Sequence, residues 1–179
     1  GQGAMVEVAL ELGTQLLLQA QMVLTEKGAR DRLRTTLQDG SAKARFGAMV
    51  RAQGGPINFA DRWQDYLEVA PAYELRAANT GYLSEIDGAA LGQAVVTLGG
   101  GRQREDDRID HSVGLSDIVP LGTYLRKGAP IARLHCRSSK QADMALRAVQ
   151  AALTLSSEPP VLPALIIERI MPEKASNHG

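Results

Sequence analysis

Cysteine is almost absent from this sequence of 179 residues and occurs only once, as Cys136. A single thiol cannot form an internal disulfide, so we expect the protein to work in a reducing compartment. Cys136 follows the segment Ile131–Leu134, with only His135 between them. We therefore expect it to be a buried small hydrophobic residue rather than a nucleophile.

The sequence also lacks an excess of charge of either sign, with 20 Lys and Arg residues against 20 Asp and Glu residues. Binding to nucleic acid or to an anionic membrane requires a basic excess or stripe, so we expect neither as a partner. No apolar run approaches the roughly 20 residues that span a bilayer, and the start lacks the cationic region of a signal peptide. We expect a cytoplasmic protein.

Sequence motifs that carry chemistry are missing as well. We find no HExxH or CxxC metal motif, no GxxxxGKS or GxxxxGKT loop, and no GxGxxG after a predicted strand. The three histidines are scattered, and adjacent residues on a strand point to opposite faces, so His135 and Cys136 cannot chelate one metal together. Three serines have no base within motif spacing: Ser84, Ser112 and Ser116. We predict no catalytic residue and no metal ligand.

The first third of the sequence has the spacing of three helices. Residues 4–22 are apolar on nearly every face, which predicts a buried helix. We expect the layer that covers this helix to lie upstream of the sequence. A second helix is predicted from Thr25 to Gln38, and a third begins at Ser41 and ends before Gly54-Gly55-Pro56.

A connector is predicted over residues 56–71, with a subdomain boundary near Pro71. Phe59, Trp63 and Tyr66 are spaced by four and three residues, as in a short amphipathic helix. These rings either pin the connector onto the domain or form a stacking platform for bases, and we favour the first interpretation.

After the connector the pattern changes to strands mixed with helices. No regular alternation of strand and helix is visible, which indicates an α+β domain. The predicted strands are Tyr73–Ala77, Tyr82–Ile86, Arg108–Val113, Ile118–Val119, Pro130–Cys136 and Val161–Ile170; the predicted helices begin at Asp87 and span Ser138–Leu155. Lys127-Gly128 is predicted to be a tight turn, and the tail from Met171 to Gly179 is predicted to be loose.

Three consecutive glycines, Gly99–Gly101, form the sharpest local signal. They follow a predicted helix, whereas a phosphate cradle precedes one, so a helix stop with a flexible hinge is the simpler interpretation. A loop carrying charges of both signs comes next, with Arg102, Arg104 and Arg108 among four acidic residues. Such a loop is either merely solvated or a mobile flap that closes on a substrate or another domain.

Several stretches of the sequence together resemble one enzyme family. They are Met49–Gly55 (MVRAQGG), Gly81–Asp87 (GYLSEID), Ala90–Gly92, Val95–Val96, Leu98–Arg102 (LGGGR) with Asp107, Ile109–Asp110 and Val113–Gly114, and finally Gly128 and Pro130. In this combination the chain, from about Val6 to Ile170, resembles the carboxy-terminal portion of thymidine phosphorylases, which are similar to the broader pyrimidine nucleoside phosphorylases.

The resemblance implies a fold and a domain organisation. Residues 4–67 would be the last helices of the large α/β lobe plus the connector, residues 72–170 an α/β-hammerhead carboxy-terminal domain, and residues 171–179 a loose tail. The helical lobe that forms the homodimer would lie upstream, as would the residues that bind phosphate and pyrimidine.

The resemblance also implies a reaction, the phosphorolysis of thymidine to thymine and 2-deoxyribose 1-phosphate. Inorganic phosphate is a co-substrate in this family and no cofactor is expected. The fragment by itself is expected to be inactive. Only the Leu98–Asp107 loop is expected near the cleft, with Gly99, Gly100, Gly101 and Arg102 as candidate closure-loop residues.

Three alternatives remain open at this point. The parent could be a broad-specificity pyrimidine nucleoside phosphorylase. Hammerhead-type domains also resemble carriers of biotinyl or lipoyl lysine, and Lys127 lies in a predicted turn, although Leu125-Arg126-Lys127-Gly128 lacks the flanking residues of those carriers. Finally, the domain could be purely structural.

Overall fold

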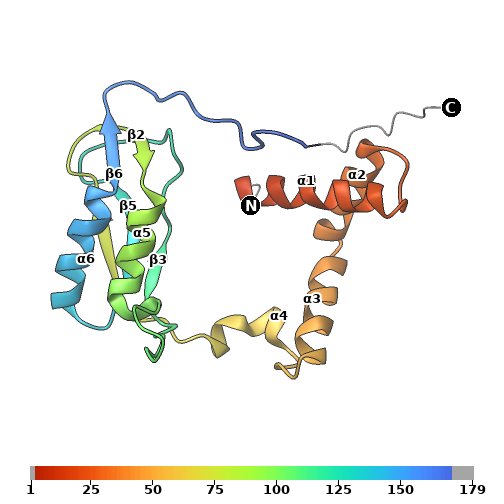
Figure 1. The fold of residues 1–179 in the computed structure, drawn as a ribbon, viewed down its shortest axis with the longest axis horizontal. Coiled ribbons are helices and arrows are strands. Elements are labelled where there is room, and N and C mark those ends of the chain that lie inside the picture. The colour runs from red at the N-terminus through yellow and green to blue at the C-terminus, as the bar shows by residue number, and fades with distance from the viewer. Residues whose placement is uncertain (1–2, 171–179) are drawn as a thin grey trace. The chain divides into compact units, whose positions relative to one another are not determined.

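The computed structural model describes residues 3–170, which divide into two compact units (Figure 1). The first unit contains residues 3–63 together with residues 163–170, and the second contains Gln64–Leu162. The prediction for the tail, residues 171–179, and the isolated His178 lie outside the described residues. Helices and small antiparallel sheets coexist, so the predicted α+β class is confirmed.

The first unit is built from three helices, α1 (Ala4–Gln19), α2 (Glu26–Gln38) and α3 (Ser41–Ala52). The predicted cap of α2 is confirmed, because the Thr25 hydroxyl accepts a hydrogen bond from the Gly28 N–H at 3.1 Å. Helix α1 packs on α2, where Ala29 is fully buried. Arg169 from the returning segment forms ion pairs with Glu11 and Glu26.

The covering layer of the first helix is predicted to lie upstream of the sequence, and within this chain one face of α1 is indeed exposed. Only Leu10 and Thr14 of α1 are buried, whereas Met5, Leu12 and Leu16 are 81%, 60% and 66% exposed. The reason is geometric: α2 covers one face of an apolar helix, and the described residues place nothing over the opposite face. The helix also ends at Gln19, three residues earlier than predicted.

The connector contains the predicted short helix, α4 (Phe59–Arg62), followed by one 3-10 turn, η1 (Trp63–Tyr66). The ring of Phe59 lies 6.2 Å from that of Phe46, centroid to centroid. This contact agrees with a pinning role for Phe59, while the side chains of Trp63 and Tyr66 remain nearly half exposed.

The second unit contains two antiparallel sheets of three strands each. In the first, β5 (Pro130–His135) lies between β1 (Ala72–Arg76) and β3 (Gly114–Ser116). In the second, β2 (Gly81–Ile86) lies between β4 (Tyr124–Leu125) and β6 (Leu153–Ser156). Adjacent strands therefore come from distant parts of the sequence, and only this pairing brings residues near 70, 112 and 136 together.

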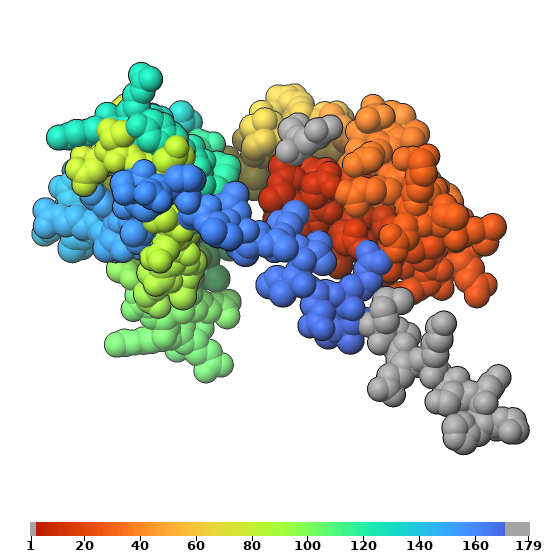
Figure 2. Space-filling view, turned by 90° about the horizontal axis from the view of Figure 1, so that it is seen from above, coloured from red at the N-terminus to blue at the C-terminus, as the bar shows by residue number. Residues whose placement is uncertain are grey.

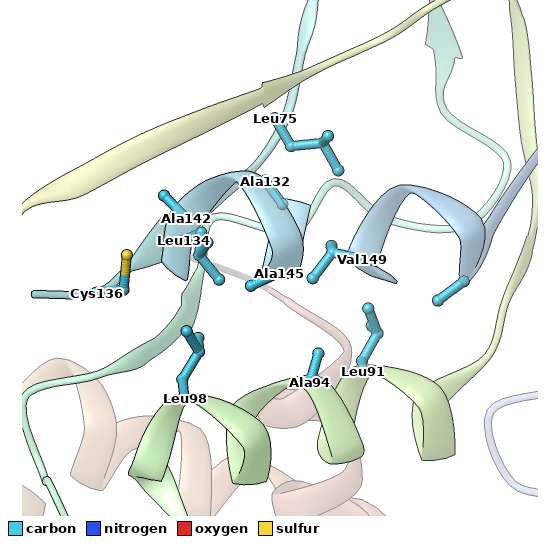
Figure 3. Packing of buried hydrophobic residues seen from close by; sticks show 11 residues of the cluster. Leu75, Leu91, Ala94, Leu98, Ala132, Leu134, Cys136, Ala142, Ala145 and Val149 are labelled. Atoms are coloured by element: carbon cyan, nitrogen blue, oxygen red, sulfur yellow. The ribbon is translucent and has the colours of Figure 1, made fainter. Parts of the chain in front are cut away.

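Helices α5 (Gly88–Val95) and α6 (Ser139–Ala151) form one hydrophobic core with the first sheet (Figure 3). Leu91, Ala94 and Leu98 point across the core toward α6 in this view. The other main contributors are Leu75, Ala132, Leu134, Ala142, Ala145 and Val149. Cys136 is fully buried in the same core, as predicted for a small hydrophobic residue.

The helix predicted over Ser138–Leu155 ends early. Helix α6 stops at Ala151, and Leu153–Ser156 forms strand β6, which pairs with β2. Leu153 and Leu155 fit a helical stripe and a strand alternation equally well, and the unpaired edge of β2 decides between them.

Three of the predicted strands are absent. Arg108–Val113 is irregular with a turn at His111 and Ser112, because Asp110 bonds locally instead of pairing with a strand. Ile118–Val119 makes one backbone bond, from the Val119 N–H to Ile131 at 2.9 Å, which is too little for a ladder. Val161–Ile170 forms no strand, since Pro163 and the prolines before the segment remove ladder donors.

Candidate functional site

Helix α5 ends at the three consecutive glycines, Gly99–Gly101, through a π-helical turn, η2 (Val96–Gly100). Gly99 has φ 95°, a left-handed conformation that only glycine adopts without strain. A Cβ on Gly100 would lie 2.7 Å from Val95 Cγ1 and 3.1 Å from the Val95 carbonyl oxygen. A Cβ on Gly101 would lie 2.7 Å from Val96 Cγ2. The helix stop is thus confirmed, and each glycine has a steric reason.

The loop that follows is closed at its root by a backbone hydrogen bond. The Asp110 N–H donates to the Gly99 carbonyl oxygen at 2.8 Å, so residues 99–110 start and end at one point. Leu98, next to this root, is buried in the core. We call residues 99–110 the glycine loop; in Figure 2 it belongs to the green part of the second unit, together with helix α5.

Inside the glycine loop, the Asp107 carboxylate holds a tight turn. Its Oδ2 accepts from the Gln103 N–H at 3.0 Å and from the Arg104 N–H at 2.8 Å. Backbone N–H groups arranged in this way can bind an anion. Here the chain supplies its own anion, so these donors are already satisfied and do not form a phosphate cradle.

The outer part of the loop is exposed. Arg102 and Arg104 carry their charges on an exposed backbone segment, as do Glu105 and Asp106. Of the four candidate closure-loop residues, the three glycines shape the turn and Arg102 places a cation beside it. The role of these residues in closure stays a prediction.

The base of the loop is fixed by an ionic group that the sequence analysis missed. Arg137 donates from Nε to Asp110 Oδ2 at 2.5 Å and from Nη2 to Asp110 Oδ1 at 3.1 Å. Its Nη1 donates to Glu68 Oε1 at 3.0 Å. The Ser112 N–H and hydroxyl donate to Asp110 Oδ1 at 3.0 and 2.6 Å. We call Glu68, Asp110, Ser112 and Arg137 the arginine cluster.

The arginine cluster has clear electrostatic consequences. The Arg137 guanidinium, with the Ser112 donors, holds the pKa of the Asp110 carboxyl far below its usual range. Asp110 and then Glu68 raise the pKa of Arg137 above its already high value. Asp110 and Arg137 are charged at any physiological pH, so these two residues form a permanent ion pair and neither acts as a proton donor or acceptor.

The connector is bound to the same region through its backbone. The Ala70 N–H donates to the Ser112 carbonyl at 2.9 Å, and the Cys136 N–H donates to the Pro71 carbonyl at 3.1 Å. His135 Nδ1 lies 3.3 Å from the Ala70 carbonyl oxygen. Residues 68–71 are therefore joined to the root of the glycine loop and to the end of β5.

One serine does meet a base in the folded chain, although no base lies within motif spacing of it in the sequence. Ser116 Oγ lies 2.8 Å from His135 Nε2, because β3 and β5 pair with Ser116 opposite Arg133. In the tautomer with the proton on Nδ1, that N–H donates to the Ala70 carbonyl and Nε2 accepts from the Ser116 hydroxyl, which in the other tautomer is free to donate to Asp117 Oδ2 at 3.3 Å. A carbonyl, not a carboxylate, orients this ring, and we interpret the pair as a link between the connector and the edge strand. The residues are 19 positions apart, so only knowledge of the strand pairing could have revealed them.

A groove of about 350 Å³ lies between α5 and α6. Its lining is almost entirely apolar, and Gln93, Thr97 and Gln141 are its polar members. None of the lining residues titrates, so the groove offers no acid, base or metal ligand. Residues 3–170 contain no group of three or more His, Cys, Asp or Glu side chains placed to hold a metal ion. Within the same range, no helix is both long and apolar enough to cross a membrane.

Comparisons with known proteins define the class of this domain. Residues 82–156 match the family described as "Pyrimidine nucleoside phosphorylase C-terminal domain". These residues, which include the glycine loop and both core helices, are similar to that family.

About nine tenths of the chain is similar to thymidine phosphorylases, which confirms the resemblance seen in the sequence. It is 39% identical to that of Sinorhizobium fredii over 165 residues, 92% of this chain and 38% of the relative. It is 37% identical to that of Colwellia psychrerythraea over 161 residues, 89% of this chain and 37% of the relative. The enzyme of Rhizobium meliloti is again 39% identical, over 92% of this chain. The chain thus spans little more than a third of these relatives and corresponds to a carboxy-terminal portion.

Proposed function

We propose that this chain is the carboxy-terminal part of a thymidine phosphorylase. The parent enzyme converts thymidine and phosphate to thymine and 2-deoxyribose 1-phosphate. The observation that carries the proposal is the similarity to thymidine phosphorylases over about nine tenths of the chain. In this proposal the first unit belongs to the large lobe, and the second unit is its α/β-hammerhead domain.

The exposed surface of the first unit supports this assignment. Met5, Leu12 and Leu16 form an apolar stripe on α1 that faces away from Leu10, and α3 adds Met49 at 48% exposure. Each such side chain contributes on the order of 1.5–3 kcal/mol when it is buried. A surface of this kind fits a further layer of the same lobe better than it fits water.

The fragment by itself is proposed to be inactive. Phosphorolysis needs a phosphate site beside the nucleoside, and water must be kept from competing with phosphate as the nucleophile. In the second unit, the backbone N–H groups at the loop turn are taken by Asp107, and the groove between α5 and α6 has no cation in its lining. Release of thymine from thymidine and phosphate by the purified chain would contradict this.

Within the parent enzyme we assign the glycine loop to closure of the cleft. Gly99, Gly100 and Gly101 set the turn, and Arg102 carries a cation on an exposed backbone. A cation of this kind complements the negative charge of phosphate in the closed state. The test is Arg102→Ala in a full-length enzyme, with the exposed Arg147 of α6 changed to Ala as the matched control. A lower kcat/KM for Arg102→Ala alone supports the role, and an unchanged value removes Arg102 from the mechanism.

The remaining expectations belong to the same proposal. They are a cytoplasmic homodimer, phosphate as co-substrate, and no further cofactor. A broad-specificity pyrimidine nucleoside phosphorylase is distinguished by comparing kcat/KM for thymidine and uridine. A carrier role for Lys127 is tested by the intact mass after expression with a biotin or lipoate ligase, where we expect no added mass.

A further inference from the structure

We propose that Arg137 is a positioning residue that couples the connector to the glycine loop. It joins Glu68, on the connector, to Asp110, at the root of the loop. A displacement of either segment is then transmitted to the other. The coupling is a property of the second unit by itself; only its use in closing a cleft rests on the proposed function.

The contacts of Arg137 are unusually directional. The guanidinium presents two N–H groups to the two oxygens of Asp110 and a third N–H to Glu68. Such a planar fork fixes both distance and orientation, which a lysine ammonium cannot do. Two segments that are 42 positions apart are therefore held by one rigid group.

The Asp110 end of the cluster is fastened firmly. Its side chain is 27% exposed, its two oxygens accept four hydrogen bonds, and its backbone N–H closes the loop on Gly99. Moving Asp110 therefore moves the loop root with it. A charged group held by several donors at once behaves as one element of a hydrogen-bond network.

The Glu68 end is the adjustable one. Its side chain is 72% exposed, and the second unit begins four residues earlier, at Gln64. An exposed ion pair contributes little to global stability. Loss of the Glu68 carboxylate should therefore leave the fold intact and weaken only the coupling between the connector and the glycine loop. This makes Glu68 a clean probe, because it contacts no residue of the glycine loop other than through Arg137 in the contacts described here.

The experiment measures amide hydrogen exchange in the 179-residue chain and in three variants, Glu68→Gln, Arg137→Lys and Arg137→Ala. The decisive probe is the Asp110 amide, whose bond to Gly99 closes the loop. Core amides of β5, such as that of Leu134, report global opening. The matched control is Arg133→Ala, which removes an exposed arginine of β5 that pairs with Asp117 at 3.2 Å.

We expect exchange at Asp110 to rise about tenfold in Arg137→Ala and a few-fold in Glu68→Gln, with core amides and the Arg133→Ala control unchanged. Arg137→Lys should resemble Arg137→Ala. Lysine keeps the positive charge, but it lacks the planar guanidinium that donates to both Asp110 and Glu68. An unchanged Asp110 amide in Glu68→Gln, or an equal rise across the core, would overturn the coupling. Neither result bears on phosphorolysis, which is measured separately in a full-length enzyme.

Discussion

The Asp110 N–H donates to the Gly99 carbonyl oxygen across 2.8 Å, and this bond makes the glycine loop a closed unit with a fixed root. The three glycines of LGGGR, together with Asp107 and Asp110, have a structural explanation in this geometry. The glycines permit the turn, Asp107 holds the tip, and Asp110 holds the base. The exposed charged residues in the outer part of the loop have no such structural role within residues 3–170 and remain available for function. They are Arg102, Arg104, Glu105 and Asp106.

The glycine turn can be tested by adding single methyl groups. Gly100→Ala should destabilise the second unit by about 1–3 kcal/mol, because the new Cβ would meet Val95 Cγ1 and the Val95 carbonyl oxygen. Gly92→Ala is the matched control, since its Cβ would meet nothing within 4 Å in helix α5, and it should stabilise by about 0.5–1 kcal/mol. Urea unfolding monitored by circular dichroism gives both values. Equal effects of the two variants would contradict the assigned geometry.

Limited proteolysis tests the exposed part of the loop. Trypsin should cut after Arg102 or Arg104 on the order of tenfold faster than after Arg133, which lies within strand β5. Asp107→Ala should accelerate this cleavage further, because the turn loses the acceptor of two backbone bonds. Mass spectrometry of the fragments identifies the sites. First cleavage within the core helices would show that the loop is not the accessible segment.

The pH dependence of stability follows from the low pKa of Asp110. A carboxyl whose folded pKa is depressed stabilises the fold above its unfolded pKa, which is about 4, and loses this contribution as pH falls through the folded value. Asp110→Asn should therefore be less stable than the parent chain at pH 5–7, and the difference should shrink only below about pH 4. Urea midpoints at pH 7, 5 and 3 measure this. A stability difference between Asp110→Asn and the parent chain that grows on acidification would contradict this prediction.

Thr14 offers a stabilising substitution in the first unit. Its residue is 2% exposed, and the described residues give its hydroxyl oxygen no hydrogen-bond partner. Thr14→Val keeps the shape and removes the unsatisfied group, which should stabilise by about 1 kcal/mol. Thr36→Val is the control, since it removes a hydroxyl that donates to the Leu33 carbonyl at 2.8 Å. A thermal shift upward for the control and downward for Thr14→Val would refute this.

Local sequence signals predicted the elements that depend on local chemistry. Thr25 caps the start of α2, Asp87 caps the start of α5, and the three glycines end α5. These features were predictable because caps and turns are decided by a few adjacent residues. The end of α6 and the existence of β6 were missed, since a free strand edge, not a propensity, selects them.

In the candidate site too, local features were predictable from the sequence and long-range contacts were not. The sequence identified the glycine loop, but it gave no sign of Arg137, whose partners lie 27 and 69 positions away. Ser116 and His135 were likewise separated until strand pairing was known. Contacts of this kind depend on how the strands pair, so they cannot be predicted from the spacing of residues along the sequence.

The most direct test of the central proposal is phosphate-dependent release of thymine from thymidine. It is measured for the purified 179-residue chain and for the complete gene product that contains these residues. We predict release only by the complete protein and only when phosphate is present. Turnover by the short chain alone, or none by the complete protein, would contradict it.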